Sequence, residues 1–280
     1  LIAYASSLDQ VGIFTRTVED NSLVYRTIAG HDLKDSTSLP VPIDHSDITK
    51  LPENLTLGYI ENAVYADGVD PEIKQAFEEM LKVYEKLGVK IKKINLASLE
   101  YSSAAYFIIS RAEAASNLAR FDGVRYGLRV DGKNLNEMYC KTRHEGFGQE
   151  VRLRIIAGNY VLSAGHADQF YRKAKNVQAW IKNEIREVLN SVDAFILPVH
   201  AGTAFKFGAF DDNKLQMDLQ DYYTCFVNLA GVPALALPCG MSSDKLPIGF
   251  QIVGAHGAEN LLFKLGHAYE KETPWHLMPV

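Results

Sequence analysis

The sequence has little cysteine, no long apolar run and no familiar metal spacing. Its three cysteines, Cys140, Cys225 and Cys239, form no CxxC pair and cannot all be paired, which indicates a reducing compartment, either the cytoplasm or an organellar matrix. None of the eight histidines lies in an HxH or HExxH spacing, so no metal site is predicted. No apolar run approaches the ~20 residues of a membrane span, and no membrane association is expected.

Several catalytic and nucleotide-binding signatures are also missing. The chain contains no GxSxG elbow, no Walker A motif and no dinucleotide fingerprint after a strand. With 29 Lys and Arg against 34 Asp and Glu, the formal charge is −5, which argues against a protein that coats nucleic acid. The start at Leu1 has no basic segment followed by an apolar stretch, so we interpret it as the interior of a longer chain rather than a signal peptide.

The patterns that are present predict an α/β fold. Strands are expected near Leu55–Ile60 and Val89–Ile94, separated by a helix that Asp70 caps and Pro71 begins, which together form a parallel βαβ unit. Continuous apolar runs further along the chain predict strands that are covered on both faces. These runs are Ala194–Val199, Pro233–Leu237 and Ile248–Val253. We therefore expect a mixed sheet flanked by helices.

One predicted helix, near 146–165, carries a charge on its apolar side. Val151, Ile155, Gly158 and Leu162 form its apolar stripe, and Arg154 lies within that stripe. A guanidinium in such a position needs a partner, because an unpaired buried charge is costly. Two interpretations remain open: a structural ion pair or snorkelling arginine, and a bidentate clamp for a carboxylate.

Two further helices carry polar stripes. In the predicted helix 217–229 the stripe consists of Asp221, Thr224 and Asn228, and in the predicted helix 102–120 it consists of Tyr106, Ser110, Glu113 and Asn117. Each could be an ordinary solvated face. Alternatively, a carboxylate that holds an ammonium group, combined with Arg154, would suit an α-amino acid.

Six stretches of the sequence carry a resemblance to a known family. They are Ala5–Gly12 (ASSLDQVG), Thr15–Asp20 (TRTVED), Asp35–Ser38 (DSTS), Arg120–Gly127 (RFDGVRYG), Glu145–Val151 (EGFGQEV) and Asn228–Pro233 (NLAGVP). The first three resemble the amidase signature family just after its serine-rich core. The others resemble, within it, the A subunits of the glutamyl-tRNA(Gln)/aspartyl-tRNA(Asn) amidotransferases.

The resemblance implies one α/β/α domain around a large mixed sheet, covering residues 1–280 and truncated at its N-terminus. In these enzymes a Lys and two Ser release ammonia from glutamine through an acyl-enzyme. A partner B subunit uses ATP and Mg to activate misacylated tRNA, and a small C subunit wraps the interface. The Lys-Ser-Ser residues would precede Leu1, so we expect no catalytic residue in this chain, and no release of ammonia from glutamine by it alone.

The same resemblance places three glutamine-binding residues in this chain. Arg154 would engage the α-carboxylate of glutamine, Asp221 its α-ammonium group, and the hydroxyl of Tyr106 would lie near the substrate. We therefore expect Arg154 and Asp221, carried by separate helices, to converge on free glutamine. His200 stands in a run, Pro198–Gly202, that departs from the usual Pro-Thr-Ala-Pro-Thr of the family; a loop histidine and a pocket residue are both possible.

Two alternatives to the amidotransferase reading remain open. A stand-alone amidase-signature hydrolase would act on another small amide, and it would not need a pair such as Arg154 and Asp221. A chain without a nucleophile could also serve as a scaffold or binding module for partner subunits, and a Lys-Ser-Ser segment encoded upstream would argue against it.

Overall fold

The computed structural model describes residues 2–277, and the chain divides into two compact units. The helical unit comprises the described residues up to Gln10 together with Glu100–Ile181. The sheet unit comprises Val11–Leu99 together with the described residues from Lys182 onward. The division falls inside helix α7 (Tyr171–Leu189). The expectation of a single domain over 1–280 stays a prediction.

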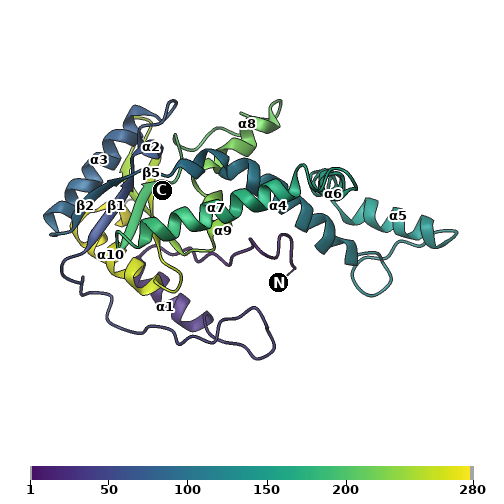
Figure 1. The fold of residues 1–280 in the computed structure, drawn as a ribbon, viewed down its shortest axis with the longest axis horizontal. Helices are drawn as coiled ribbons and strands as arrows, with labels where there is room; N and C mark the ends of the chain where they lie inside the picture. Colours follow the sequence, from purple (N-terminus) through teal and green to yellow (C-terminus); the bar gives the residue numbers. More distant parts are fainter. Residues whose placement is uncertain (1, 278–280) are drawn as a thin grey trace. The chain divides into compact units, whose positions relative to one another are not determined.

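The sheet unit is built on five strands in the order β2-β1-β3-β5-β4. Of these, β2, β1 and β5 are labelled in Figure 1. They are β1 (Thr56–Ile60), β2 (Lys90–Ile94), β3 (Ala194–Pro198), β4 (Ala234–Met241) and β5 (Pro247–Gly254). Strand β1 pairs in parallel with β2 and β3, whereas β5 pairs antiparallel with β3 and β4. The predicted mixed sheet is confirmed.

The βαβ unit forms as its sequence predicts. Helix α3 (Pro71–Lys86) starts where the Asp70 side chain accepts a hydrogen bond of 2.8 Å from the Glu72 N–H, with Pro71 in the first helical position. Its apolar side chains, spaced at helical intervals, are buried. These side chains are Ile73, Phe77, Met80 and Tyr84. The helix therefore covers the sheet with one face and leaves its charged face in solvent.

Aromatic side chains mark the two layers that cover the sheet. On one face, Tyr84 of α3 and Tyr269 of α10 (Glu259–Glu272) stack at 5.6 Å, and both lie edge-on to Phe250 of β5. On the other face, Phe195 of β3 lies 6.3 Å from Phe226 of α9 (Cys225–Ala230). Because neighbouring residues of a strand point to opposite faces, Gln251 shares the face of Phe195. The predicted α/β fold with helices on both sides is confirmed.

Short helices complete the sheet unit. They are α1 (Val18–Ile28), α2 (Glu61–Val64), α8 (Lys214–Leu219), η3 (Gln220–Tyr223) and η4 (Trp275–Leu277). A 3₁₀ turn, η1 (Ala97–Tyr101), lies at the division between the units. No helix among the described residues has both the length and the apolar character that a bilayer crossing requires.

The helical unit is organised around two long helices, α4 (Ser102–Asn117) and α6 (Gln149–Leu162). They pack against each other closely at Gly158, where an added Cβ would lie 2.0 Å from the carbonyl oxygen of Arg111. Only glycine permits such an approach of two backbones. The unit also contains η2 (Leu118–Arg120) and α5 (Leu135–Gly146).

Two local predictions were wrong and one helix was not predicted. The unpredicted helix is α5, whose start is fixed by the Asn134 side chain accepting from the Glu137 N–H. Gly146 ends α5 and does not begin the next helix, which starts at Gln149. Strand β4 is not covered on both faces over its first half: Leu235 and Leu237 are buried beside Gly266 of α10, whereas Ala234 and Ala236 are exposed.

Candidate functional site

Arg154 lies on α6 with two partners. Its Nε donates to Glu150 Oε1 at 3.0 Å, one helical turn back, and its Nη1 donates to the Tyr4 hydroxyl at 3.3 Å. The guanidinium also lies 5.9 Å from the centre of the Tyr4 ring. The expected partner for this charge is therefore present, and the side chain remains 38% exposed.

The charge of Arg154 is secured by these contacts. Burial by itself disfavours the cation, but the hydrogen bonds to Tyr4 and Glu150 outweigh burial and raise the pKa of Arg154. Among the described residues no acceptor lies at Nη2. Nη2 carries two N–H groups, which can donate to a carboxylate ligand.

The polar stripe of α4 holds the N-terminal segment of the helical unit. Glu113 accepts hydrogen bonds from the Ser7 N–H at 2.9 Å and from the Ser7 hydroxyl at 2.5 Å. Asn117 donates to the Tyr4 carbonyl and to the Ser6 hydroxyl, both at 3.1 Å. At Glu113 and Asn117, which are half-buried, the polar groups of this face therefore bind a neighbouring segment.

The two other members of that stripe differ from each other. Ser110 is buried, and its hydroxyl donates to the Phe107 carbonyl at 3.3 Å, one turn back on α4. Tyr106 is half-buried on the same helix. Ser110 is thus satisfied within the helix, and Tyr106 stays a predicted substrate residue.

Asp221 lies on a 3₁₀ turn rather than on the long helix that was expected. The segment 217–229 is broken into α8, η3 and α9, and Asp221 is exposed on η3. Its carbonyl accepts from the Thr224 N–H at 3.0 Å and from the Thr224 hydroxyl at 3.2 Å. A threonine hydroxyl that binds a carbonyl three residues back competes with α-helical bonding, which accounts for the break.

A buried glutamine fastens the end of this turn to the sheet. Gln251 of β5 is 3% exposed, and its amide Nε2 donates to the Tyr223 carbonyl at 2.6 Å and to the Pro198 carbonyl at 3.3 Å. The Tyr223 hydroxyl donates to the Ala63 carbonyl at 3.1 Å. The residue two positions after Asp221 is therefore held at both its backbone and its side chain.

Two of the three cysteines lie in the core, and Cys239 is not a reactive thiol. Cys225 and Cys239 are buried and Cys140 is exposed. Burial, with a smaller contribution from Glu79, raises the pKa of the Cys239 thiol to about 12, so it stays protonated near neutral pH. Within residues 2–277 no three His, Cys, Asp or Glu side chains gather as metal ligands would.

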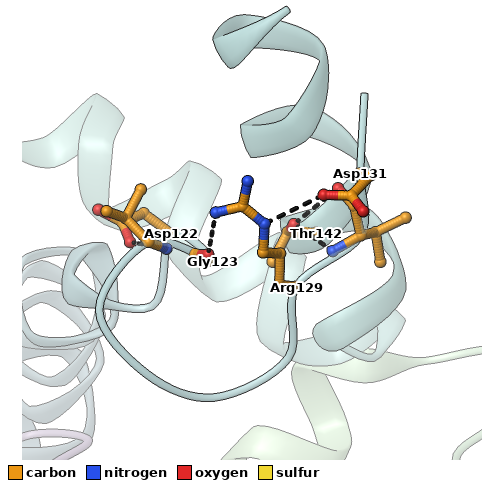
Figure 2. A network of polar contacts seen from close by, with 7 residues as sticks. Asp122, Gly123, Arg129, Asp131 and Thr142 are labelled. Atoms are coloured by element: carbon orange, nitrogen blue, oxygen red, sulfur yellow. Dashed lines mark hydrogen bonds and ion pairs between the residues drawn. The ribbon is translucent and has the colours of Figure 1, made fainter. Parts of the chain in front are cut away.

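The Arg120–Gly127 motif builds a folded loop (Figure 2). Arg129 donates to the Gly123 carbonyl at 3.4 Å and to Asp131 at 3.1 Å. The buried Thr142 of α5 accepts from the Val130 N–H at 3.0 Å, and a Cβ at Gly123, whose φ is +84°, would lie 2.9 Å from the Thr142 hydroxyl oxygen. The motif glycine therefore serves the packing of this loop against α5.

Comparison with known proteins identifies the family. Residues 1–263 match the protein family described as Amidase. The chain belongs to the amidase family. The resemblance inferred from the motifs is thereby confirmed over nearly the whole sequence.

Curated relatives of this amidase chain share one description. The A subunit of glutamyl-tRNA(Gln) amidotransferase from Thermodesulfovibrio yellowstonii is 46% identical over 99% of the chain, and its counterpart from Listeria monocytogenes is 44% identical over 99%. The chain covers 58% and 57% of these two proteins, so it spans a little over half of the length of the relatives it matches.

Solved structures agree with the family assignment. The crystal structure of the A subunit of glutamyl-tRNA(Gln) amidotransferase from Thermotoga maritima is 34% identical and superposes with a TM-score of 0.77, covering 97% of this chain and 54% of that one. A 6-aminohexanoate cyclic dimer hydrolase, 20% identical, superposes with a TM-score of 0.73 over 95% of this chain and 55% of that chain, which shows the shared fold alone.

The predicted site residues divide between the two units. Tyr106 and Arg154 lie in the helical unit and Asp221 lies in the sheet unit. Their convergence on one ligand stays a prediction. Tyr4, which binds Arg154, was missed, because the two residues are 150 positions apart and no local pattern links them.

Proposed function

We propose that these 280 residues are the glutamine-recognising part of an amidotransferase A subunit. The full-length protein would release ammonia from glutamine for the transamidation of Glu-tRNA(Gln), and of Asp-tRNA(Asn) in organisms that use that route. The observation that carries this proposal is the 46% identity to an amidotransferase A subunit over 99% of the chain, against 20% for a hydrolase of the same fold.

The roles of the site residues follow from their chemistry. Arg154 is charged and partly exposed, and its Nη2 would donate to the α-carboxylate of glutamine. Asp221 supplies an exposed carboxylate for the α-ammonium group. Tyr106 places its hydroxyl near the substrate. The serine nucleophiles and the lysine base would belong to the rest of the full-length protein.

The partners follow from the same proposal. A B subunit with ATP and Mg would activate the misacylated tRNA and receive the ammonia, and a C subunit would bind both. The chain itself would contact tRNA only through the B subunit, and would bind neither ATP nor metal. The expected compartment is the cytoplasm or an organellar matrix.

The test uses the full-length protein assembled with its B and C subunits. We expect ammonia release from glutamine, and conversion of Glu-tRNA(Gln) to Gln-tRNA(Gln) that requires ATP. Simple amides without an amino-acid head group should be poor substrates. Efficient hydrolysis of such amides, with no activity on glutamine, would instead identify a stand-alone amidohydrolase. Binding of the partner subunits without any amide hydrolysis would identify a scaffold.

A further inference from the structure

His200 uses both ring nitrogens at the end of β3. Its Nε2 lies 2.7 Å from Gln220 Oε1, and its Nδ1 lies 3.0 Å from both the backbone nitrogen and the carbonyl oxygen of Gly202. Gln220 donates through its Nε2 to the Gln216 carbonyl at 2.8 Å, so its Oε1 must be the atom that faces His200. His200 therefore donates from Nε2 to Gln220, and its Nδ1 contacts the backbone of Gly202.

The residue that His200 binds is the immediate neighbour of Asp221. Gln220 begins the turn η3, and Tyr223 ends it. Gln251 holds Tyr223 from the sheet, as described above, and His200 holds Gln220 from the loop after β3. Asp221 thus lies on a turn whose first and last residues are both fixed by side chains of the β3–β5 region.

The turn η3 carries the exposed Asp221. A short 3₁₀ turn has few internal hydrogen bonds and little cooperativity, so its conformation has to be fixed by contacts from outside. A binding group that is already ordered loses less conformational entropy when its ligand arrives. The contacts of His200 supply that order at the beginning of the turn.

We propose that His200 is a positioning residue, which holds Gln220 so that Asp221 is fixed for the α-ammonium group of glutamine. This inference rests on the proposed function. It predicts that His200 affects the recognition of the amino group of the substrate, and leaves the recognition of its carboxylate and the chemistry at the amide unchanged.

Two matched substitutions separate the two contacts of His200. In His200→Gln the longer amide can still donate to Gln220, whereas in His200→Asn the shorter amide can reach Gly202 only. In the full-length complex we expect His200→Asn to raise the KM for glutamine about three- to tenfold, the value of one neutral hydrogen bond, with kcat nearly unchanged. His200→Gln should restore most of the loss.

A substrate analogue tests whether the effect passes through Asp221. For the glutamine analogue that lacks the α-amino group, His200→Asn should leave kcat/KM as in the unsubstituted enzyme. In an Asp221→Asn background, His200→Asn should add no further loss. An equal loss on both substrates would show a merely structural role and would overturn the inference.

The two proposals fail in different ways. If the unsubstituted complex is active on glutamine and Asp221→Asn raises KM, but His200→Asn does not, only the role of His200 is overturned. If the unsubstituted complex has no activity on glutamine, the proposed function is overturned, and the role of His200 with it.

Discussion

Arg154 and Asp221 carry opposite charges and are held in place by different means. Arg154 is part of α6, a helix of 14 residues that packs on α4 through the bare backbone of Gly158. Asp221 lies on η3, a turn of four residues fastened by the side chains of Gln251 and His200. The first position is fixed by close packing and the second by individual hydrogen bonds.

This difference determines what each position tolerates. A packed helix pair is sensitive to any added volume at its contact, and insensitive to most changes on its exposed face. A turn held by side-chain hydrogen bonds is sensitive to the loss of single polar groups, because the carbonyls left behind are buried. The positions of Arg154 and Asp221 should therefore be disturbed by different kinds of substitution.

The largest effect should come from removing either charge itself. In the full-length complex, Arg154→Ala should raise the KM for glutamine and lower kcat/KM by a factor equivalent to ~2–5 kcal/mol, because one side of a charge pair is lost. Asp221→Ala should do the same. Steady-state ammonia release measures both variants.

The matched control for Arg154 is Arg152, two residues back on the same helix. Its Nη1 lies 2.6 Å from Nδ1 of His144, and it contacts none of the residues assigned to the ligand. Arg152→Ala should leave kcat/KM for glutamine unchanged. If Arg154→Ala also leaves kcat/KM for glutamine unchanged, Arg154 is a structural ion-pair residue and the proposed binding role is wrong.

Added volume at the helix contact should have the next largest effect. In Gly158→Ala the new Cβ would meet the Arg111 carbonyl at 2.0 Å and the Ala115 Cβ at 2.8 Å, so α4 and α6 must separate. We expect a loss of about 3 kcal/mol in the free energy of unfolding. Denaturant unfolding measures it, and Asn159→Ala, at the exposed neighbouring position, is the control. Equal stability of the two variants would contradict the packing account.

Local chemistry in the sequence was sufficient to predict much of the fold. The Asp70–Pro71 start of α3 and the apolar runs of β3 and β5 are visible without any structure. The need of Arg154 for a partner was also predictable, and Glu150, four residues back, satisfies it as a helical pair. These features depend on residues that are close together in the chain.

The remaining features depend on contacts between distant residues. Tyr4 reaches Arg154, and Gln251 reaches Tyr223, across separations that no periodicity encodes. The break at Thr224 was missed because a helical pattern of apolar residues does not reveal which hydroxyls turn back onto the backbone. For the site, residue types were therefore predictable, and the way each one is held was not.

Removal of one polar group should be enough to weaken the turn that carries Asp221. Gln251→Leu keeps the side-chain size but leaves the Tyr223 and Pro198 carbonyls without their amide donor. We expect a loss of about 1–3 kcal/mol in the free energy of unfolding, and a higher KM for glutamine. In Gln251→Glu an ionised carboxylate would face two carbonyl oxygens, so the loss in the free energy of unfolding should be larger than in Gln251→Leu. A fully stable Gln251→Leu variant with unchanged KM would show that the turn does not need this clamp.

The smallest predicted effect concerns Glu270, whose side chain holds the start of α1 in the sheet unit by hydrogen bonds. Glu270 of α10 is 8% exposed, and both its carboxylate oxygens accept from the Val18 N–H, at 3.1 and 3.0 Å, at the start of α1. Burial raises the pKa of Glu270 above its usual 4.5, and the hydrogen bond to Val18 opposes this only in part. The folded protein therefore binds this proton more tightly than the unfolded chain does.

The sign of the resulting pH dependence follows from that shift. The contribution of Glu270 to stability is largest below its usual pKa and declines as the pH rises through the raised pKa. Glu270→Gln keeps an acceptor for the Val18 N–H and removes the titration. As the pH rises from 4 to 7, the free energy of unfolding of Glu270→Gln should therefore increase relative to that of the unsubstituted protein. A shift in the opposite direction would mean that the start of α1 stabilises the carboxylate more than burial penalises it.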